Sequence, residues 1–316
     1  MMRRIRTSAA PASAGRDIGR IVGLVVVFYL AWVGFSLGVQ HLPAPAMLRE
    51  LLPLLTLGLH LGFAALALAL FHRTFSRIFK AHPRLRLALI AFCVLVALAL
   101  YGGSRWLVLS PSVFVDLFGT ANLLLLAMVV GSWMTTALSR PAELVPVCLV
   151  MSLVDIFSVS RGPSRFIAGR IEEFYLKGRE GLPPVGDFLL IKMTLPGGTA
   201  AFPVFGVSDW IIVAFLALAA ARFEYNDNLL GPGLATLGET KRPALYFPLP
   251  AAALLLAVLL AQFTGIFLPA LPFISVLFLA FLFVRYPASR QLLRTDWMLV
   301  LTAFGVMAAL MLLPPR

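Results

Sequence analysis

The chain has 316 residues, of which 60% are hydrophobic and only 13% are charged. A soluble domain of this size carries about a quarter charged residues, so the composition excludes a soluble globular protein and indicates a polytopic membrane protein. The formal net charge is +12, but the basic residues fall in short loops between apolar runs. That pattern is typical of topology signals and of contacts with membrane lipids, not of nucleic-acid binding.

Nine apolar runs have the length and composition of membrane spans. They cover residues 21–39, 51–71, 87–107, 113–137, 142–160, 202–222, 245–266, 268–285 and 296–313. The expected fold class is therefore an all-α polytopic membrane protein of about nine transmembrane helices. The first run follows a basic tail, residues 1–20, and is longer than the apolar region of a signal peptide, which favours a membrane anchor.

Alternation of the spans places the N-terminus and the loops near 72–86, 138–141, 223–244 and 286–295 on one side of the membrane. That side holds most of the Lys and Arg residues, so the positive-inside rule makes it cytoplasmic. We expect an integral multi-pass protein of a prokaryotic plasma membrane with its N-terminus in the cytoplasm.

The only long loop, residues 161–201, lies on the opposite side. Its first part, Ser164–Glu180, has apolar residues at helical spacing among basic ones, which predicts an amphipathic helix on the membrane surface. Asp187–Leu195 reads as a short strand. Gly197-Gly198 and Pro203 predict a flexible segment before the next span.

Two acids interrupt consecutive apolar runs. Asp155 lies about five residues before the long loop and Asp209 about seven residues into the span after it. At about 1.5 Å of rise per residue, both carboxyls lie about 7–11 Å below the same membrane face. Ionisable groups at such depth are costly and indicate a functional site, so we expect the two acids to pair on neighbouring antiparallel helices.

A third feature is Pro269-Ala270-Leu271-Pro272, at the start of the eighth run. Proline removes a backbone donor and breaks a helix, so this segment is expected to expose carbonyl groups toward a wet cavity. Pro243-Ala244-Leu245 repeats the tripeptide at the start of the seventh run. We prefer Pro269 because a full span separates it from the run that contains Asp209.

These three elements resemble the ordered motifs of presenilins and signal peptide peptidases, which are intramembrane aspartyl proteases. The matching residues are Asp155 in Leu-Val-Asp-Ile-Phe, Gly206-Val207-Ser208-Asp209 and Pro269-Ala270-Leu271, and the resemblance covers about residues 145–285. It implies catalytic roles for Asp155 and Asp209 and substrate-binding roles for the residues beside them. Those residues are Gly206, Val207, Ser208, Pro269, Ala270 and Leu271.

The chain departs from the family pattern at three points. Val154 stands where the family has tyrosine, Ser208 replaces the second glycine of Gly-x-Gly-Asp, and four spans instead of five precede Asp155. We divide the chain into the tail (1–20), a helical scaffold (21–141), a catalytic core (142–285) and an additional C-terminal span (286–316).

The implied chemistry is hydrolysis of peptide bonds within transmembrane helices, with one proton shared between the two carboxyls and a water molecule as nucleophile. We expect the strand and the Pro-Ala-Leu segment to clamp an unwound substrate by strand addition. No metal or cofactor is required. His60, with no second His or Cys one turn away, is expected to pack in the core or face a cavity.

Other interpretations stay open. The aspartates also fit a structural pair in a catalytically inactive relative, or a proton relay in a membrane transporter. Asn122 is expected to bond across helices. Asp116, Glu143 and Asp296 lie at the ends of spans and are read as interface residues.

Overall fold

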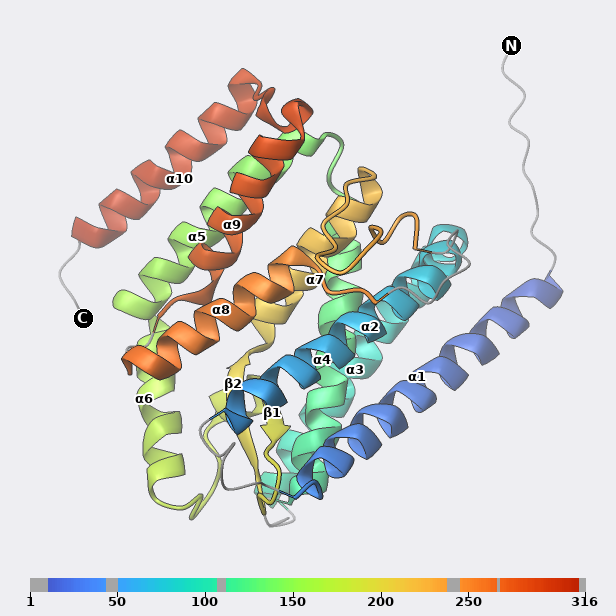
Figure 1. Ribbon diagram of the computed structural model, residues 1–316, viewed down its shortest axis with the longest axis vertical. Coiled ribbons are helices and arrows are strands. Elements are labelled where there is room, and N and C mark those ends of the chain that lie inside the picture. Colours follow the sequence, from blue (N-terminus) through green and yellow to red (C-terminus); the bar gives the residue numbers. More distant parts are fainter. Residues whose placement is uncertain (1–10, 44–50, 107–111, 238–244, 266–267, 313–316) are drawn as a thin grey trace.

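The structure is a computed structural model that describes residues 11–43, 51–106, 112–237, 245–265 and 268–312. It is a bundle of helices with one β-hairpin at the lower end in Figure 1. The α-helices are α1 Pro11–Gln40, α2 Leu52–Ala81, α3 Pro83–Trp106, α4 Val113–Thr135, α5 Leu144–Ser160, α6 Pro163–Leu176, α7 Val207–Arg222, α8 Leu249–Thr264, α9 Ala270–Arg285 and α10 Arg294–Leu312. The antiparallel strands are β1 Leu190–Thr194 and β2 Ala201–Gly206.

Within the described ranges, five helical segments are long and apolar enough to cross a membrane. They are Asp17–Gln40, Leu52–Ala81, Pro83–Arg105, Val113–Thr135 and Pro141–Ser160. A helix satisfies its own backbone groups in lipid, which is why such apolar sequences form helices there. The chain is therefore a helical multi-pass membrane protein. Helices α8 and α9 are apolar but shorter, with 16 residues each.

Helix α7 lies at the centre of the bundle, and its residues from Ile212 to Ala221 are all buried. It packs mainly against α4. Gly131 of α4 permits this close approach, because a Cβ built there would lie 2.8 Å from the backbone nitrogen of Phe215. Small residues at helix interfaces let membrane helices pack backbone to backbone.

The segment before α7 corrects two sequence predictions. The span predicted at 202–222 is a helix only from Val207, because residues 201–206 form β2 and pair with β1. The strand predicted at Asp187–Leu195 begins at Leu190, after a 3₁₀ turn at Val185–Leu189. Pro203 cannot donate to a helix, and the segment bonds instead across the hairpin. The amphipathic helix predicted at Ser164–Glu180 is present as α6, although it ends at Leu176.

The first helices are longer than predicted. Helix α1 begins at Pro11, inside the predicted tail 1–20, of which residues 1–10 lie outside the described part of the chain. Helix α2 continues to Ala81, so the basic residues expected in the loop 72–86 lie on the ends of α2 and α3. Residues 243–244 of the second Pro-Ala-Leu tripeptide also lie outside the described ranges.

Asp296 and Asn122 each form contacts between helices. Arg140, before α5, forms an ion pair of 3.2 Å with Asp296, which lies in the first turn of α10 and is 3% exposed. Asn122 bonds across helices as expected, accepting from the Tyr29 hydroxyl of α1 at 2.6 Å and donating to the Cys93 carbonyl of α3 at 2.8 Å.

Candidate active site

Asp155 lies near the end of α5, where its carboxylate meets the first turn of α9. The backbone N–H of Leu271 donates to Asp155 Oδ2 at 3.1 Å. Pro269 is the extended N-cap residue of α9, and the first N–H groups of a helix have no partner within it. From the sequence, exposed carbonyl groups are expected in this segment, and the contact with Asp155 is made instead by an N–H group. This N–H lies at the positive end of the helix dipole, which suits a carboxylate.

Asp209 lies at the start of its helix, and its carboxylate also accepts a backbone N–H. It lies in the first turn of α7, and the N–H of Gly206, the N-cap residue, donates to Asp209 Oδ2 at 3.0 Å. This is the acidic half of a capping box. Because β2 runs directly into α7, the carboxyl of Asp209 is held at the junction of strand and helix.

Asp155 is close enough to Asp209 for the two carboxyl groups to interact electrostatically. From the sequence, the two acids are expected to lie on neighbouring helices. In the structure the helices that carry them, α5 and α7, are not packed closely on each other. Helix α5 packs mainly against α9 and α10, and α7 packs mainly against α4 and α8 (Figure 1). The first turn of α9 reaches Asp155 through the Leu271 N–H, and helix α9 also contacts α7, the helix that carries Asp209.

The two aspartates have similar exposed area, although the Asp209 carboxyl is surrounded by protein atoms. Both aspartates are partly exposed, and Val154 and Ile156, which flank Asp155, are 52% and 40% exposed. Each carboxylate uses only Oδ2 for the hydrogen bonds above, and among the described residues no donor reaches either Oδ1. One oxygen of each acid is thus available to a water molecule or a substrate.

The predicted substrate-binding residues border these carboxyls. Gly206 and Leu271 supply the two N–H donors, Val207 begins α7, and Ser208 is exposed. A Cβ at Gly206 would lie 3.2 Å from Ser208 Oγ and 3.6 Å from Asp209 Oδ2, so glycine keeps this corner open. Pro269 and Ala270 are partly exposed at the start of α9.

The two outer edges of the hairpin differ in what they contact, and on β2 the Ala201 carbonyl accepts from Arg179 Nη1 at 3.4 Å. Lys192 of β1 donates its N–H to Thr120 Oγ1 of α4 at 3.0 Å and accepts from the same hydroxyl at 3.3 Å, so α4 caps the outer edge of β1. In an antiparallel pair of strands, two opposite residues that are not hydrogen-bonded to each other both direct their backbone N–H and C=O groups toward the outer edges of the pair. Pro203, the partner of Lys192, and Gly206, the partner of Leu190, therefore face the outer edge of β2. Asp209, bonded to Gly206, lies along that edge.

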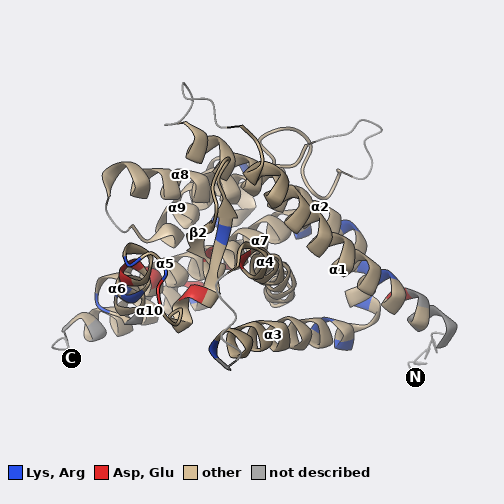
Figure 2. Cartoon of the chain, turned by 90° about the horizontal axis from the view of Figure 1, so that it is seen from below, with Lys and Arg blue, Asp and Glu red and all other residues tan. Residues whose placement is uncertain are grey.

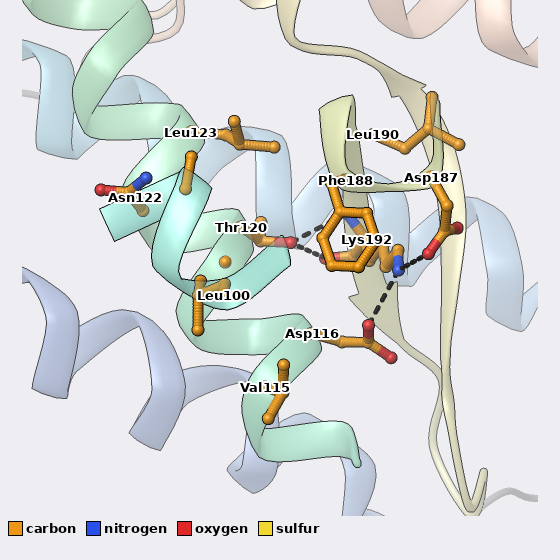
Figure 3. A pocket seen from close by; sticks show the side chains of 12 residues that line it. Leu100, Val115, Asp116, Thr120, Asn122, Leu123, Asp187, Phe188, Leu190 and Lys192 are labelled. Carbon is orange, nitrogen blue, oxygen red and sulfur yellow. Dashed lines mark hydrogen bonds and ion pairs between the residues drawn. The ribbon is translucent and has the colours of Figure 1, made fainter. Parts of the chain in front are cut away.

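A buried ionic cluster beside the hairpin was missed in the sequence. The Lys192 ammonium lies between the carboxylates of Asp116 and Asp187 (Figure 3). Arg179 also reaches Asp116, at 2.7 Å, and the Tyr175 hydroxyl donates to Asp187 at 2.9 Å. Asp116, predicted as an interface residue in the first turn of its helix, is thus also an ion-pair partner. The signal available was the lysine inside the apolar segment Leu-Leu-Ile-Lys-Met-Thr.

The cluster connects α4, the hairpin and the segment after α6. Burial and the neighbouring Asp187 carboxylate raise the pKa of Tyr175 well above its ordinary value, so the phenol stays a donor. A cavity of about 30 Å³ adjoins Asp116, Asp187 and Lys192, which is room for a water molecule. The cluster fixes the position of β1, and through β2 the position of Asp209.

A third buried aspartate lies outside the membrane spans, in the loop after α7. Asp227 is 1% exposed and accepts from the Tyr246 hydroxyl at 3.3 Å. Burial raises the pKa of the Asp227 carboxyl to about 7. Asp227 is 18 residues from Asp209 along the chain, at the opposite end of α7, so it takes no part in the site.

His60 is fully buried on α2, where Nδ1 lies 2.8 Å from the Thr56 carbonyl, which fits its expected packing in the core. In the part of the chain that the structure describes, no three His, Cys, Asp or Glu side chains gather as a metal site. No family model, no curated protein and no solved structure matches the chain. The resemblance to presenilins and signal peptide peptidases therefore stays a prediction that rests on the three motifs.

Proposed function

We propose that the chain is an intramembrane aspartic endopeptidase that cuts transmembrane helices or signal-peptide remnants with Asp155 and Asp209. The observation that carries the proposal is the meeting of three distant segments: both carboxyls interact, and the Leu271 N–H of the Pro-Ala-Leu segment bonds to Asp155. If the two acids were paired by chance, nothing would require the Pro-Ala-Leu segment to lie beside them. The arrangement supports assignment to the presenilin and signal peptide peptidase type.

The reaction follows from two neighbouring carboxyl groups that share one proton, because like charges at short range do not both ionise. The ionised carboxylate takes a proton from a water molecule, and the water oxygen attacks the peptide carbonyl carbon. The protonated partner donates to the carbonyl oxygen and then, through the tetrahedral intermediate, a proton reaches the leaving amine as the C–N bond breaks. The unpartnered Oδ1 atoms supply the positions for water and substrate.

The substrate is a membrane helix that unwinds locally, since a helical peptide bond is shielded by its neighbours. The outer edge of β2 offers a place for the unwound segment, because strand addition pairs its backbone with an open sheet edge. This modifies the clamp expected from the sequence, because α4 covers β1, so the substrate would pair with the part of β2 that follows the Arg179-bonded residue Ala201. A strand on that edge runs past Gly206 toward Asp209.

The rest of the proposal concerns the bundle. We propose that α7 to α10 complete about nine spans with α1 to α5, that the N-terminus is cytoplasmic, and that the protein resides in a prokaryotic plasma membrane. Helix α7 is about 24 Å long at 1.5 Å per residue. The hairpin extends this path toward the membrane face, which supports a span that is part helix and part strand.

One observation favours a second candidate, a catalytically inactive relative. Each aspartate receives a hydrogen bond at the N-terminus of a helix, which is also what a purely structural capping residue does. A proton-linked transporter is the other alternative that involves buried acids. The test must therefore separate acid chemistry from capping.

Asp→Asn substitutions make this separation, because the amide oxygen still accepts the N–H of Leu271 or Gly206 but the group no longer titrates. The purified chain is reconstituted with a synthetic transmembrane peptide, and cleavage is followed by mass spectrometry. We expect Asp155→Asn and Asp209→Asn each to lower the rate by about a hundred-fold or more. Asp227→Asn, which removes a buried acid remote from the site, is the matched control and leaves the rate unchanged.

Cleavage at the wild-type rate by Asp155→Asn or by Asp209→Asn contradicts the dyad. No cleavage of any transmembrane peptide by the wild-type chain, together with intact folding of all variants, supports the inactive relative instead.

A further inference from the structure

We propose that a recess between α1 and α2 binds the headgroup of an anionic phospholipid, best one with two phosphates. The recess has a volume of about 620 Å³ and lies between the start of α1 and the last turns of α2. It is separate from the aspartates, and the proposal does not depend on proteolysis. In Figure 2, Lys and Arg residues lie along α1, α2 and α3, and others lie around α6 and on the hairpin.

Three arginines line the recess: Arg20 from α1, and Arg73 and Arg77 from α2. Arg73 and Arg77 are four residues apart on a helix and therefore present their side chains on one face. All three are exposed, and within the described ranges none of these guanidinium groups has a hydrogen-bond or ion-pair partner. Most other arginines described here are engaged, as Arg179 is with Asp116. Free guanidinium groups are suited to bidentate recognition of phosphate.

The charge of the recess matches a headgroup with two phosphates. Asp17 is the only acid in the lining, and it lies 3.8 Å from His82 Nε2. Three guanidinium charges against one carboxylate leave two positive charges. The hydroxyl of Thr74 is bonded to the Leu70 carbonyl of its own helix, so the arginines are the donors that remain for a ligand.

Apolar side chains continue from the arginines along both helices. Leu24 and Val27 follow Arg20 at helical spacing on α1, and they are 36% and 61% exposed. Leu66 and Leu70 precede Arg73 on α2 and are 42% and 55% exposed. A phosphate held by the arginines thus places acyl chains against an apolar surface. This continuity favours a lipid over a free phosphate, and basic pockets between membrane helices are known lipid sites.

The recess lies at one end of the α1–α2 pair, and the aromatic contact between the two helices lies farther along. Trp32 and Phe35 of α1 pack on His60 and Phe63 of α2, with ring centroids 4.6–5.7 Å apart. Near the recess the side chains of Asp17 and His82 bridge the two helical segments.

The experiment measures bound lipid by native mass spectrometry of the detergent-purified full chain incubated with cardiolipin, with phosphatidylcholine, or with inorganic phosphate. The wild type is expected to retain cardiolipin and neither of the others. At about 1 kcal/mol for each arginine, the double variant Arg73→Gln/Arg77→Gln binds cardiolipin about thirty-fold more weakly, which is about 2 kcal/mol.

The matched control is Arg285→Gln/Arg294→Gln, which removes the same charge from two arginines that lie outside the recess. It is expected to retain cardiolipin at the wild-type affinity. An equal loss in both double variants overturns the proposal, because it shows attraction to net charge alone. Retention of phosphatidylcholine, or binding of inorganic phosphate at the same affinity, overturns the assignment to an anionic lipid. Arg73→Lys/Arg77→Lys keeps the charge and is expected to bind more weakly than wild type but more tightly than the Gln variant.

Discussion

Replacement of Lys192 by methionine tests whether the ionic cluster holds the hairpin. The Lys192 side chain is 6% exposed, and its partners Asp116 and Asp187 are 8% and 2% exposed. The substitution keeps the aliphatic length but leaves two buried carboxylates with only Arg179 and Tyr175. Removing one partner of a buried ion pair costs about 3–5 kcal/mol. Since whole domains are stable by about 5–15 kcal/mol, this is a large part of the total.

The assay is unfolding in mixed micelles titrated with SDS, followed by circular dichroism. The matched control is Lys177→Met, because Lys177 pairs with Glu173 at 2.6 Å but both side chains are 64% exposed. Water and salt screen such a pair, so no measurable change is expected there. Adding Asp187→Asn to Lys192→Met is expected to restore part of the stability by removing one unpaired charge. A loss below about 1 kcal/mol for Lys192→Met, or an equal loss for Lys177→Met, would refute the reasoning.

Three further outcomes are expected. Gly131→Val separates α4 from α7, because a Cβ meets the Phe215 nitrogen at 2.8 Å. We expect the free energy of unfolding to fall by about 1–3 kcal/mol and peptide cleavage to slow, and Gly131→Ala should lose less stability. The pKa of the Asp227 carboxyl, about 7, is raised above the ordinary value by burial, so its stabilising effect is complete in acid and is lost as pH rises through 7. The melting temperature of the wild type should therefore fall relative to that of Asp227→Asn as pH rises from 5 to 8. A constant difference between the two melting temperatures would disprove the assignment. Gly206→Ala places a Cβ in tight contact with Ser208 Oγ, at 3.2 Å, and beside Asp209 Oδ2, at 3.6 Å. Cleavage should therefore slow while the melting temperature changes little, and an unchanged rate would show that this corner needs no open space.

Much of this site can be predicted from the sequence because its acidic residues stand within apolar segments. A carboxyl inside an apolar run is costly, so Asp155 and Asp209 stand out without any structure. The loop between them fixes their depth, since consecutive membrane helices must run in opposite directions. The Pro-Ala-Leu segment is conspicuous for a different reason, because two prolines close together limit where a helix begins.

The role of that segment could not be read from the sequence. Pro269 ends up as the N-cap residue and Pro272 lies within the first turn of α9, so the prolines begin a helix instead of breaking one. Proline is tolerated in a first turn because its missing N–H has no intrahelical partner there. The N–H of Leu271, which bonds to Asp155, becomes visible only when the position of α9 relative to α5 is known.

The second strand was missed for a reason of composition. Residues 201–206 are as apolar as the helix that follows, so hydropathy alone extends the span through them. Pro203 is a signal against a helix, but together with Gly197-Gly198 it predicts only a flexible segment and not a strand. Strand pairing is a contact between separated residues, and the bulge in the hairpin between Ile191 and Lys192 hides the alternation that would have shown it.

Cross-linking of positions 155 and 209 tests the meeting of the two acids most directly. The variant combines Asp155→Cys and Asp209→Cys in a background where the buried Cys93 and Cys148 are replaced by alanine. A short bismaleimide is added in membranes, and the intact mass distinguishes one bridging linker from two singly attached ones. The control pair is Asp155→Cys with Asp227→Cys, at the far end of α7. The account predicts a bridge between 155 and 209 and none between 155 and 227. Two singly attached linkers at 155 and 209 would contradict it.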